Sequence, residues 1–221
     1  AKLIIANSHA TKTMLVNHFG ISEDKVKVVH NGISPLKDLA HYKKEPSALT
    51  TIGYIGRVEA MKGIQALIDA VSLLSSDEKS RVKVEIWGTG EAKPSLEEYS
   101  KDKGPIHFMG RAKDPYQAIK NFDLMIVPSI REPFGVVVVE AGYFSIPVIA
   151  SKVDGLAEVI SDGKTGLLIK PKNEVNDKIF VNKVPIPQFV VDPEKNTLVN
   201  PKEICPHELA EHLKNYLKDP S

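Results

Sequence analysis

Short apolar runs alternate with amphipathic stretches along most of the chain. The runs are rich in Val and Ile, and several end at Gly, Pro or Asn, as strands buried on both faces of a parallel sheet do. We therefore expect strands over residues 2–6, 26–30, 51–55, 82–87, 106–109, 124–127, 147–150 and 166–169.

The stretches between these runs predict helices. Residues 63–74 carry apolar side chains at the i, i+3, i+4, i+7 spacing of one helix face. Further helices are expected over residues 8–19, 91–101, 136–144 and 208–217, the first opened by a polar cap. Because strands alternate with helices, the expected fold class is α/β, a Rossmann-like open parallel sheet with helices on both faces.

Two regions interrupt this alternation. Residues 31–47 are polar, carry prolines near both ends and are interpreted as a linker. Residues 171–206 are proline-rich, with strand-like pieces at 178–181 and 188–191. A structureless loop of that length is uncommon in a compact domain, so we expect an excursion, with a hairpin as one arrangement. An acceptor-side or partner-binding contact and a purely structural elaboration are both open for it.

Composition narrows the function classes. Lys and Arg total 29 against 28 Asp and Glu, and a net charge of +1 excludes a broad basic surface for nucleic acid. The single cysteine, Cys205, cannot form an internal disulfide, which favours a reducing compartment and a cytoplasmic location. No apolar run approaches the roughly 20 residues of a membrane span. The chain lacks an initial methionine, and we interpret it as an excised piece of a longer protein.

Several short motifs do not withstand inspection. The Gly-Lys-Thr of residues 163–165 lacks the earlier glycine of a phosphate-binding loop, since Glu158 stands there, and a strand follows it. His207 and His212 lie five residues apart, so their rings point to different sides of a helix. Gly88-Thr89-Gly90 lacks the third glycine of a dinucleotide fingerprint, and the chain has no Asp-x-Asp pair. The seven histidines are scattered, and we predict no metal site.

The first segment that carries chemistry reads Gly-Arg-x4-Lys-Gly and follows the strand that ends at residue 55. It places Arg57 and Lys62 between the carboxyl end of a strand and the start of a helix, where open α/β sheets bind ligands. Arginine grips phosphate oxygens with two prongs, lysine adds a point charge, and the helix start adds free N–H groups. The segment suits a diphosphate, although alone it fits two exposed cations beside a turn equally well.

The second segment holds two carboxylates, Glu132 and Glu140, around the start of the helix expected at 136–144. Glu140 lies among apolar neighbours, where a charge needs a partner, and two vicinal ribose hydroxyls are the obvious candidates. The N–H groups of Gly135, Val136 and Val137 face an anion if the helix begins there. Two surface glutamates on a helix are the alternative.

The third segment is a strand end that breaks at glycine. Backbone groups at Met109 and Gly110 would pair with the edge of a nucleobase, with Arg111 packed beside it. An ordinary strand-to-turn junction explains the same residues.

Together these segments resemble the donor-binding, C-terminal half of a GT-B glycosyltransferase of the GT4 type. The resemblance rests on the Gly-Arg-x4-Lys-Gly segment and the Glu-x7-Glu pair, and further motifs in the family's order reinforce it. These motifs are Val-x-His-Asn-Gly (28–32), Ile-Trp-Gly-Thr-Gly (86–90), Pro-Val-Ile-Ala (147–150) and Asp-Gly-Lys-Thr-Gly (162–166).

The resemblance implies roles for these residues. Arg57 and Lys62 would bind the diphosphate and stabilise the leaving group, while Glu132, the third catalytic residue, would contact the donor hexose. Glu140 would hold the ribose. The implied donor-binding set is Gly56, Arg57, Lys62, Gly88, Met109, Gly110, Arg111, Phe134, Gly135, Val136, Val137 and Glu140. The family retains anomeric configuration and needs neither metal nor cofactor, and the implied donor is a UDP- or GDP-sugar.

The resemblance also implies an organisation. Residues 1–34 would be the end of an N-terminal domain and a hinge, and 35–170 the nucleotide-sugar-binding domain. Residues 171–206 would be the excursion, and 207–221 the last helix of the same domain. The acceptor-binding domain is absent and is the implied partner. Similar enzymes often use lipid-linked acceptors, so peripheral contact of that domain with the cytoplasmic face of a membrane is open.

We therefore expect the nucleotide-sugar-binding domain of a retaining hexosyltransferase, inactive or nearly so in isolation. The alternative is a non-catalytic module that keeps this fold to bind a partner. The presence of all four residues Arg57, Lys62, Glu132 and Glu140 argues against it, because nothing structural requires them together. A nicotinamide-dependent enzyme lacks its glycine fingerprint here.

Overall fold

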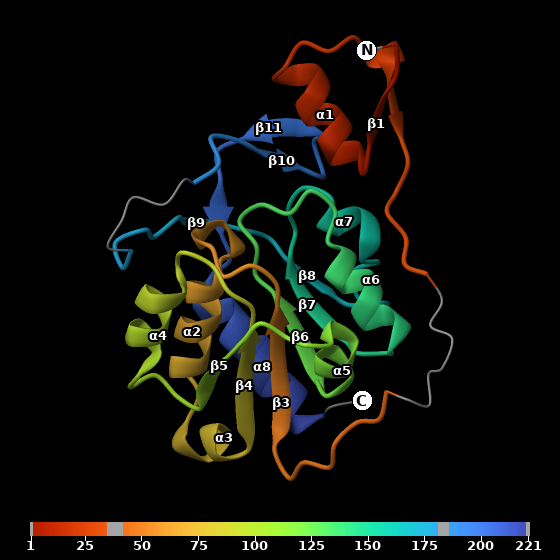
Figure 1. Cartoon of the computed structure of the whole chain (residues 1–221). Coiled ribbons are helices and arrows are strands. Elements are labelled where there is room, and N and C mark those ends of the chain that lie inside the picture. Colours follow the sequence, from red (N-terminus) through yellow and green to blue (C-terminus); the bar gives the residue numbers. More distant parts are fainter. Residues whose placement is uncertain (1, 35–41, 181–185, 220–221) are drawn as a thin grey trace.

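A six-stranded parallel sheet forms the centre of the molecule (Figure 1). The computed structural model describes residues 2–34, 42–180 and 186–219. The strand order is β5-β4-β3-β6-β7-β8. The strands are β3 (Thr50–Ile55), β4 (Val82–Trp87), β5 (Ile106–Gly110), β6 (Leu124–Val127), β7 (Val148–Ser151) and β8 (Leu167–Ile169). All six lie within two residues of the predicted ranges, and the α/β fold class is confirmed.

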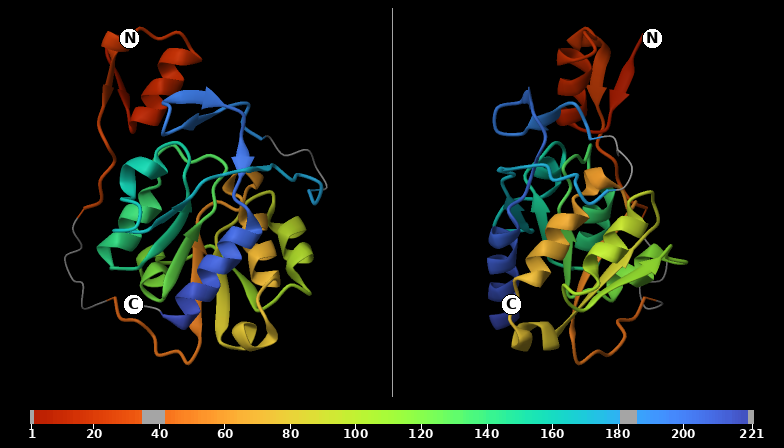
Figure 2. Two further views of the ribbon diagram at one scale, coloured as in Figure 1. Left: turned by 180° about the vertical axis from the view of Figure 1, so that it is seen from behind. Right: turned by 90° about the vertical axis from the view of Figure 1, so that its left-hand side faces the viewer.

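Helices cover both faces of the sheet (Figure 2). On one face lie α2 (Ile64–Ser72), α4 (Lys93–Ser100) and α8 (Pro206–Lys218), around a core that includes Ile52, Leu67 and Leu213. On the other lie α5 (Pro115–Lys120), α6 (Val136–Tyr143) and α7 (Leu156–Val159), around Phe122 and Met125. The sequence predicted all four of α2, α4, α6 and α8, the first from its apolar periodicity.

Three short helices were not predicted from the sequence, because their formation depends on caps or on tertiary packing. The helix α3 (Ser76–Ser80) begins with a capping box between Ser75 and Glu78. The helix α5 begins at Asp114, whose carboxylate accepts the N–H groups of Tyr116 and Gln117. The helix α7 has four residues and no side-chain cap, and buried Leu156 holds it to the core.

A small N-terminal unit stands beyond the carboxyl ends of the strands (Figures 1 and 2). It consists of β1 (Ile4–Ala6), α1 (His9–Asn17), the 3-10 turn η1 (Glu23–Lys25) and β2 (Val26–Val28), with β1 and β2 paired in parallel. Ser8 caps α1 by accepting the Thr11 N–H. The predicted elements at 2–6, 8–19 and 26–30 are present and shorter than expected.

The proline-rich excursion forms two antiparallel strand pairs. β9 (Asn173–Glu174) pairs with β12 (Lys202–Glu203), and β10 (Val190–Asp192) pairs with β11 (Thr197–Val199). The expected hairpin is therefore present. The piece predicted at 188–191 contributes only Val190 and Val191, and Lys178 and Ile179 form a turn, so the expected strand at 178–181 is wrong over its described residues.

The hairpin β10–β11 packs against α1 (Figure 1). Ala10 and Met14 of α1 are buried against Val191, and the Thr13 hydroxyl donates to the side-chain oxygen of Asn196. The excursion thus joins the N-terminal unit to the sheet domain. Nothing in the local sequence pattern indicated this contact.

Two expectations concern segments outside the sheet. Residues 35–41 of the predicted linker lie outside the described residues, and its described part contains no helix or strand. Among the helices that the structure describes, none has both the length and the apolar character that crossing a bilayer requires.

The excursion also buries a carboxylate whose charge is disfavoured. Glu203 on β12 is buried, and burial raises its pKa to about 7, against the lowering effect of the Asn176 N–H. The nearby charge of Asp69 adds to the rise. The folded state therefore binds this proton more tightly than the unfolded chain, whose pKa is near 4.5. The resulting stabilisation is complete below that pH and is lost as pH rises through 7.

We predict that Glu203→Gln removes this pH dependence. The free energy of unfolding of the unchanged protein, relative to the variant, should fall by about 3 kcal/mol between about pH 4 and pH 8. Urea unfolding at a series of pH values measures the difference. Glu174→Gln controls for loss of an exposed carboxylate from the paired strand. A difference between Glu203→Gln and the unchanged protein that stays constant with pH would contradict the prediction.

Candidate functional site

A cavity of about 330 Å³ opens at the carboxyl ends of β3 and β6, beside the N-terminal unit. These strands are neighbours, but the helices that follow them, α2 and α6, cover opposite faces. Ligands of open α/β sheets bind where the direction of winding switches in this way. The lining residues are Asn7, Asn31, Tyr54, Ile55, Gly56, Arg57, Lys62, Val127, Ser129, Glu132, Pro133, Phe134, Gly135, Val136 and Val137.

Glycines let the loops around this cavity pack backbone against backbone. Gly63 has φ +64°, and a Cβ there would lie 2.0 Å from the carbonyl oxygen of Pro128. A Cβ on Gly88 would lie 1.8 Å from the carbonyl oxygen of Gly56. Gly63 and Gly88 are therefore steric requirements, and Gly63 holds Lys62 directly beside the loop after β6.

Lys62 and Glu132 form an ion pair at the cavity, with 2.7 Å between Nζ and Oε2. Their side chains are only 12% and 16% exposed, so little water screens the pair. Among the described residues that line the cavity, Glu132 is the one carboxylate, and Lys62 already neutralises it. The lining therefore suits an anion that replaces Glu132 as the partner of Lys62 better than it suits a metal cation.

Arg57 lines the same cavity but has another partner. Its guanidinium lies 2.5 Å from the Glu59 carboxylate, and its side chain is 68% exposed. Its backbone carbonyl accepts the hydroxyl of buried Tyr54 at 2.7 Å. Burial, with the charges of Glu132 and Glu59, raises the pKa of Tyr54, which keeps this hydroxyl a donor. The backbone of Arg57 is thus fixed, whereas its side chain is exposed and pairs with Glu59.

The helix α6 begins at the cavity. Its first residue follows Gly135, which has φ +91° and gives no side-chain cap to the N–H groups of Val136 and Val137. This positive φ favours glycine, and a Cβ there would lie 2.7 Å from the Leu156 side chain. The positive end of the helix therefore faces the cavity uncapped, which favours an anion.

A buried aspartate anchors the loop that carries Glu132. The Asp154 carboxylate accepts the N–H of Glu132 at 3.0 Å and the N–H of Val191 at 2.6 Å. The Gly155 N–H returns a bond to the Glu132 carbonyl at 3.1 Å. Burial raises the pKa of Asp154, although both accepted N–H bonds oppose the rise. One side chain thus ties the loop after β6 to the hairpin β10–β11.

The other predicted site residues lie outside the cavity lining. Gly88 donates its N–H to the Gly110 carbonyl at 2.7 Å, so the ends of β4 and β5 meet beside β3. Met109 and Arg111 are exposed there. Glu140, on α6, is half-buried, and burial raises its pKa. The structure brings Arg57, Lys62, Glu132 and residues 134–137 together at one cavity and places Met109–Arg111 two strands away.

Sequence reasoning missed seven residues of the lining, of which four carry polar side chains: Asn7, Asn31, Tyr54 and Ser129. The hydroxyl of Ser129 is buried and has no hydrogen-bond partner among the described residues. Ser129 directly follows the β6 run and Pro128, and a polar residue at a strand's carboxyl end was the available signal. Asn7 and Asn31 come from the N-terminal unit, and no local pattern places them here.

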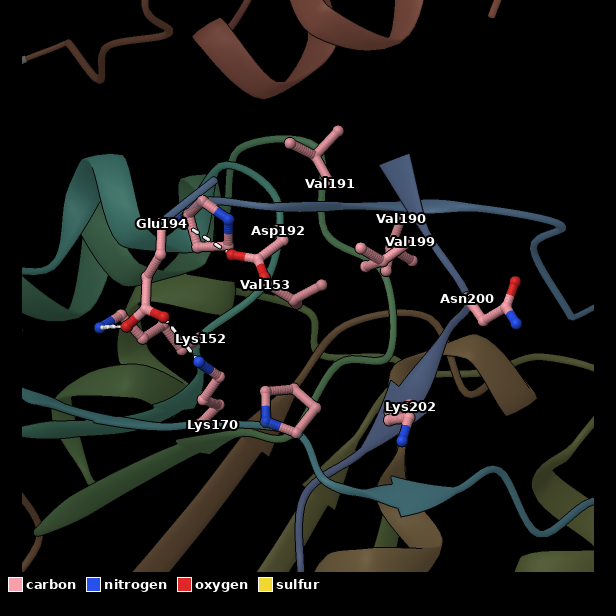
Figure 3. A pocket seen from close by; sticks show the side chains of 12 residues that line it. Lys152, Val153, Lys170, Val190, Val191, Asp192, Glu194, Val199, Asn200 and Lys202 are labelled. Carbon is pink, nitrogen blue, oxygen red and sulfur yellow. Dashed lines mark hydrogen bonds and ion pairs between the residues drawn. The ribbon is translucent and has the colours of Figure 1, made fainter. Parts of the chain in front are cut away.

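A second cavity, of about 290 Å³, lies between the ends of β7 and β8 and the hairpin (Figure 3). Val153, Val190 and Val199 line it. At its edge, Glu194 bridges Lys152 at 2.7 Å and Lys170 at 2.6 Å, and these lysines lower the pKa of Glu194 to about 2. Because Val153 of the sheet domain meets Val190 and Val199 of the hairpin here, we assign this cavity to the packing of the excursion.

Comparison with known proteins identifies the family. The family model described as Glycosyl transferases group 1 matches residues 41–184. An uncharacterized glycosyltransferase, MJ1607 of Methanocaldococcus jannaschii, is 32% identical over 186 residues, covering 77% of this chain and 47% of that protein. A D-inositol 3-phosphate glycosyltransferase of Rhodococcus jostii is 30% identical over 191 residues, covering 75% of this chain and 41% of that protein.

Solved structures share the fold. Anabaena Alr3699/HepE in complex with UDP-glucose has a TM-score of 0.72 at 25% identity, covering 100% of this chain and 55% of that one. WaaG, a glycosyltransferase involved in lipopolysaccharide biosynthesis, has a TM-score of 0.65 at 16% identity, covering 97% of this chain and 58% of that one. The chain thus spans about half the length of the relatives that it matches.

We predict that Asp154→Asn lowers the free energy of unfolding by about 1–3 kcal/mol, because the amide oxygen can replace only one carboxylate oxygen and its NH2 faces a donor. Urea unfolding measures the loss, and hydrogen exchange at the Glu132 and Val191 amides should accelerate. Asp102→Asn, on an exposed aspartate, is the control. Equal stability of the two variants would contradict the anchoring role.

Proposed function

Because the chain belongs to the glycosyl transferases group 1 family, we propose that it is the donor-binding half of a retaining, metal-independent glycosyltransferase of the GT4 type. The enzyme moves a hexose from a UDP- or GDP-sugar to a glycan or a lipid-linked acceptor. The observation that carries this proposal is the Lys62–Glu132 pair, held at the switch-point cavity under the uncapped start of α6.

The diphosphate takes the place of Glu132 as the partner of Lys62. The α6 N-terminus faces the same space, and Arg57 turns from Glu59 to the phosphates. These groups stabilise the charge that develops on the nucleoside diphosphate as the bond to the sugar breaks, which is the task a metal performs elsewhere. Glu132, released from Lys62, accepts hydrogen bonds from the donor hexose.

The nucleoside extends from the phosphates toward the ends of β4 and β5. Glu140 accepts the ribose hydroxyls, and burial already disfavours its unpartnered charge. Gly88 and residues 109–111 border the base. UDP and UDP-glucose are bound in structures of Alr3699/HepE, which supports a uridine donor ahead of a guanosine one.

The acceptor lies on a domain that meets the N-terminal unit. Ile5, Val29 and Phe19 are large apolar side chains exposed on that unit, which supports a surface that further structure covers. The relatives are about twice as long as this chain, in agreement with a second domain. We expect the chain alone to bind nucleotide weakly and to transfer little sugar, and the whole enzyme to be cytoplasmic, with membrane contact made by the other domain.

We predict that Lys62→Ala weakens UDP binding by about 100-fold or abolishes it, because a charged hydrogen bond to phosphate is lost. Isothermal calorimetry with UDP and GDP measures the effect. Lys83→Ala is the matched control. It breaks the Lys83–Glu85 pair, which has the same 2.7 Å separation and lies near the amino end of β4, outside the cavity lining. Unchanged affinity in Lys62→Ala would refute the diphosphate assignment. Failure of the unchanged chain to bind either nucleotide would favour the non-catalytic module.

We predict that Glu132→Gln binds UDP at least as tightly as the unchanged chain, because it removes the carboxylate that competes for Lys62. The same variant should lose whatever extra affinity UDP-hexose has over UDP. Calorimetry with both ligands separates the two effects. A tenfold weaker affinity for UDP itself would show that Glu132 serves the phosphates or the fold instead of the sugar.

A further inference from the structure

Three side chains that can hold a metal meet outside the donor cavity. His9 begins α1, His30 follows β2, and Glu158 lies on α7. One ligand atom from each lies within 4.8 Å of the others, and no other such group of three occurs within residues 2–34, 42–180 and 186–219. His30 Nε2 lies 2.8 Å from Glu158 Oε2, and the two imidazole rings lie 5.8 Å apart at 73°.

We propose that His9, His30 and Glu158 form a Zn²⁺ site that joins the N-terminal unit to the sheet domain. Two imidazoles and one carboxylate are a donor set typical of zinc, which binds each at about 2.0–2.2 Å. The rings of His9 and His30 are exposed, so a fourth position is open to water.

Two of the three ligands are held in place before a metal arrives. The Glu158 carboxylate accepts the N–H of His9 at 2.8 Å and the N–H of Ala10 at 2.9 Å, one on each oxygen. The His30 ring stacks on Phe134, with centroids 5.4 Å apart and 30° between the planes. Outer contacts that orient the ligands are a regular feature of zinc sites.

The charge of Glu158 favours a cation on the side of its carboxylate that faces away from the start of α1. The N-terminus of α1 is positive and alone would repel a metal. Glu158 stands between them, and its full negative charge outweighs the partial charge of the helix end. Because α1 and β2 belong to the N-terminal unit and α7 to the sheet domain, the ion cross-links them beside Phe134 of the donor cavity.

Calorimetry of the metal-free 221-residue chain with Zn²⁺ tests the site. We expect one zinc per chain, and the visible spectrum of the Co²⁺ form should show tetrahedral coordination. His9→Gln and His30→Gln should each weaken Zn²⁺ binding more than about 100-fold, since loss of outer contacts alone costs 10–100-fold. Glutamine at position 30 keeps a side-chain N–H donor for Glu158, and the backbone N–H of residue 9 is unchanged, so both variants should retain the fold, as circular dichroism will show.

His207→Gln and Cys205→Ser are the controls. Both residues can bind zinc, but they lie at the start of α8 and outside the group of His9, His30 and Glu158. Neither should change the zinc affinity or the 1:1 stoichiometry. Zinc affinity that survives in either His9→Gln or His30→Gln, or that falls in a control, would overturn the proposal. So would weak binding at several sites. UDP affinity is measured in parallel, and its presence or absence bears on the donor site alone.

Discussion

The buried carboxylate of Asp154 is the constraint that the site depends on. It holds the N–H of Glu132 on one side and the N–H of Val191 on the other. The first bond fixes the loop that faces Lys62, and the second fixes the hairpin on which α1 packs. A single desolvated group therefore couples the geometry of the cavity to the position of the N-terminal unit. Removing it leaves buried N–H groups unpaired, which costs more than the bonds gain.

The cavity gathers two cations, and a neighbouring carboxylate balances the charge of each. Lys62, which is largely buried, is paired with Glu132, and exposed Arg57 is paired with Glu59. In the proposed function, a diphosphate that enters would exchange one anion for another, and the freed carboxylate would face the sugar. Glu132 balances the charge of Lys62 in the structure, and the proposed function gives it the further role of contacting the hexose.

Features set by a local sequence pattern were predictable from the sequence. Features set by contacts between residues far apart in the chain were not. Buried strands and long amphipathic helices such as α2 and α8 follow from periodicity, and the Lys62–Glu132 cavity follows from motifs at strand ends. Asn7, the contact of Met14 with Val191, and the meeting of His9 and His30 with Glu158 join residues far apart in the chain. The sequence predicted Arg57 as a ligand of the diphosphate. It did not indicate that the guanidinium pairs with Glu59, two residues along the chain.

A crystal structure of the chain with bound UDP tests the central claim most directly. The account predicts that the Lys62–Glu132 pair is broken and that Lys62 Nζ lies about 3 Å from a diphosphate oxygen, with the phosphates facing the start of α6. UDP bound elsewhere on the chain, or bound with the Lys62–Glu132 pair intact and the phosphates away from Lys62, would contradict it.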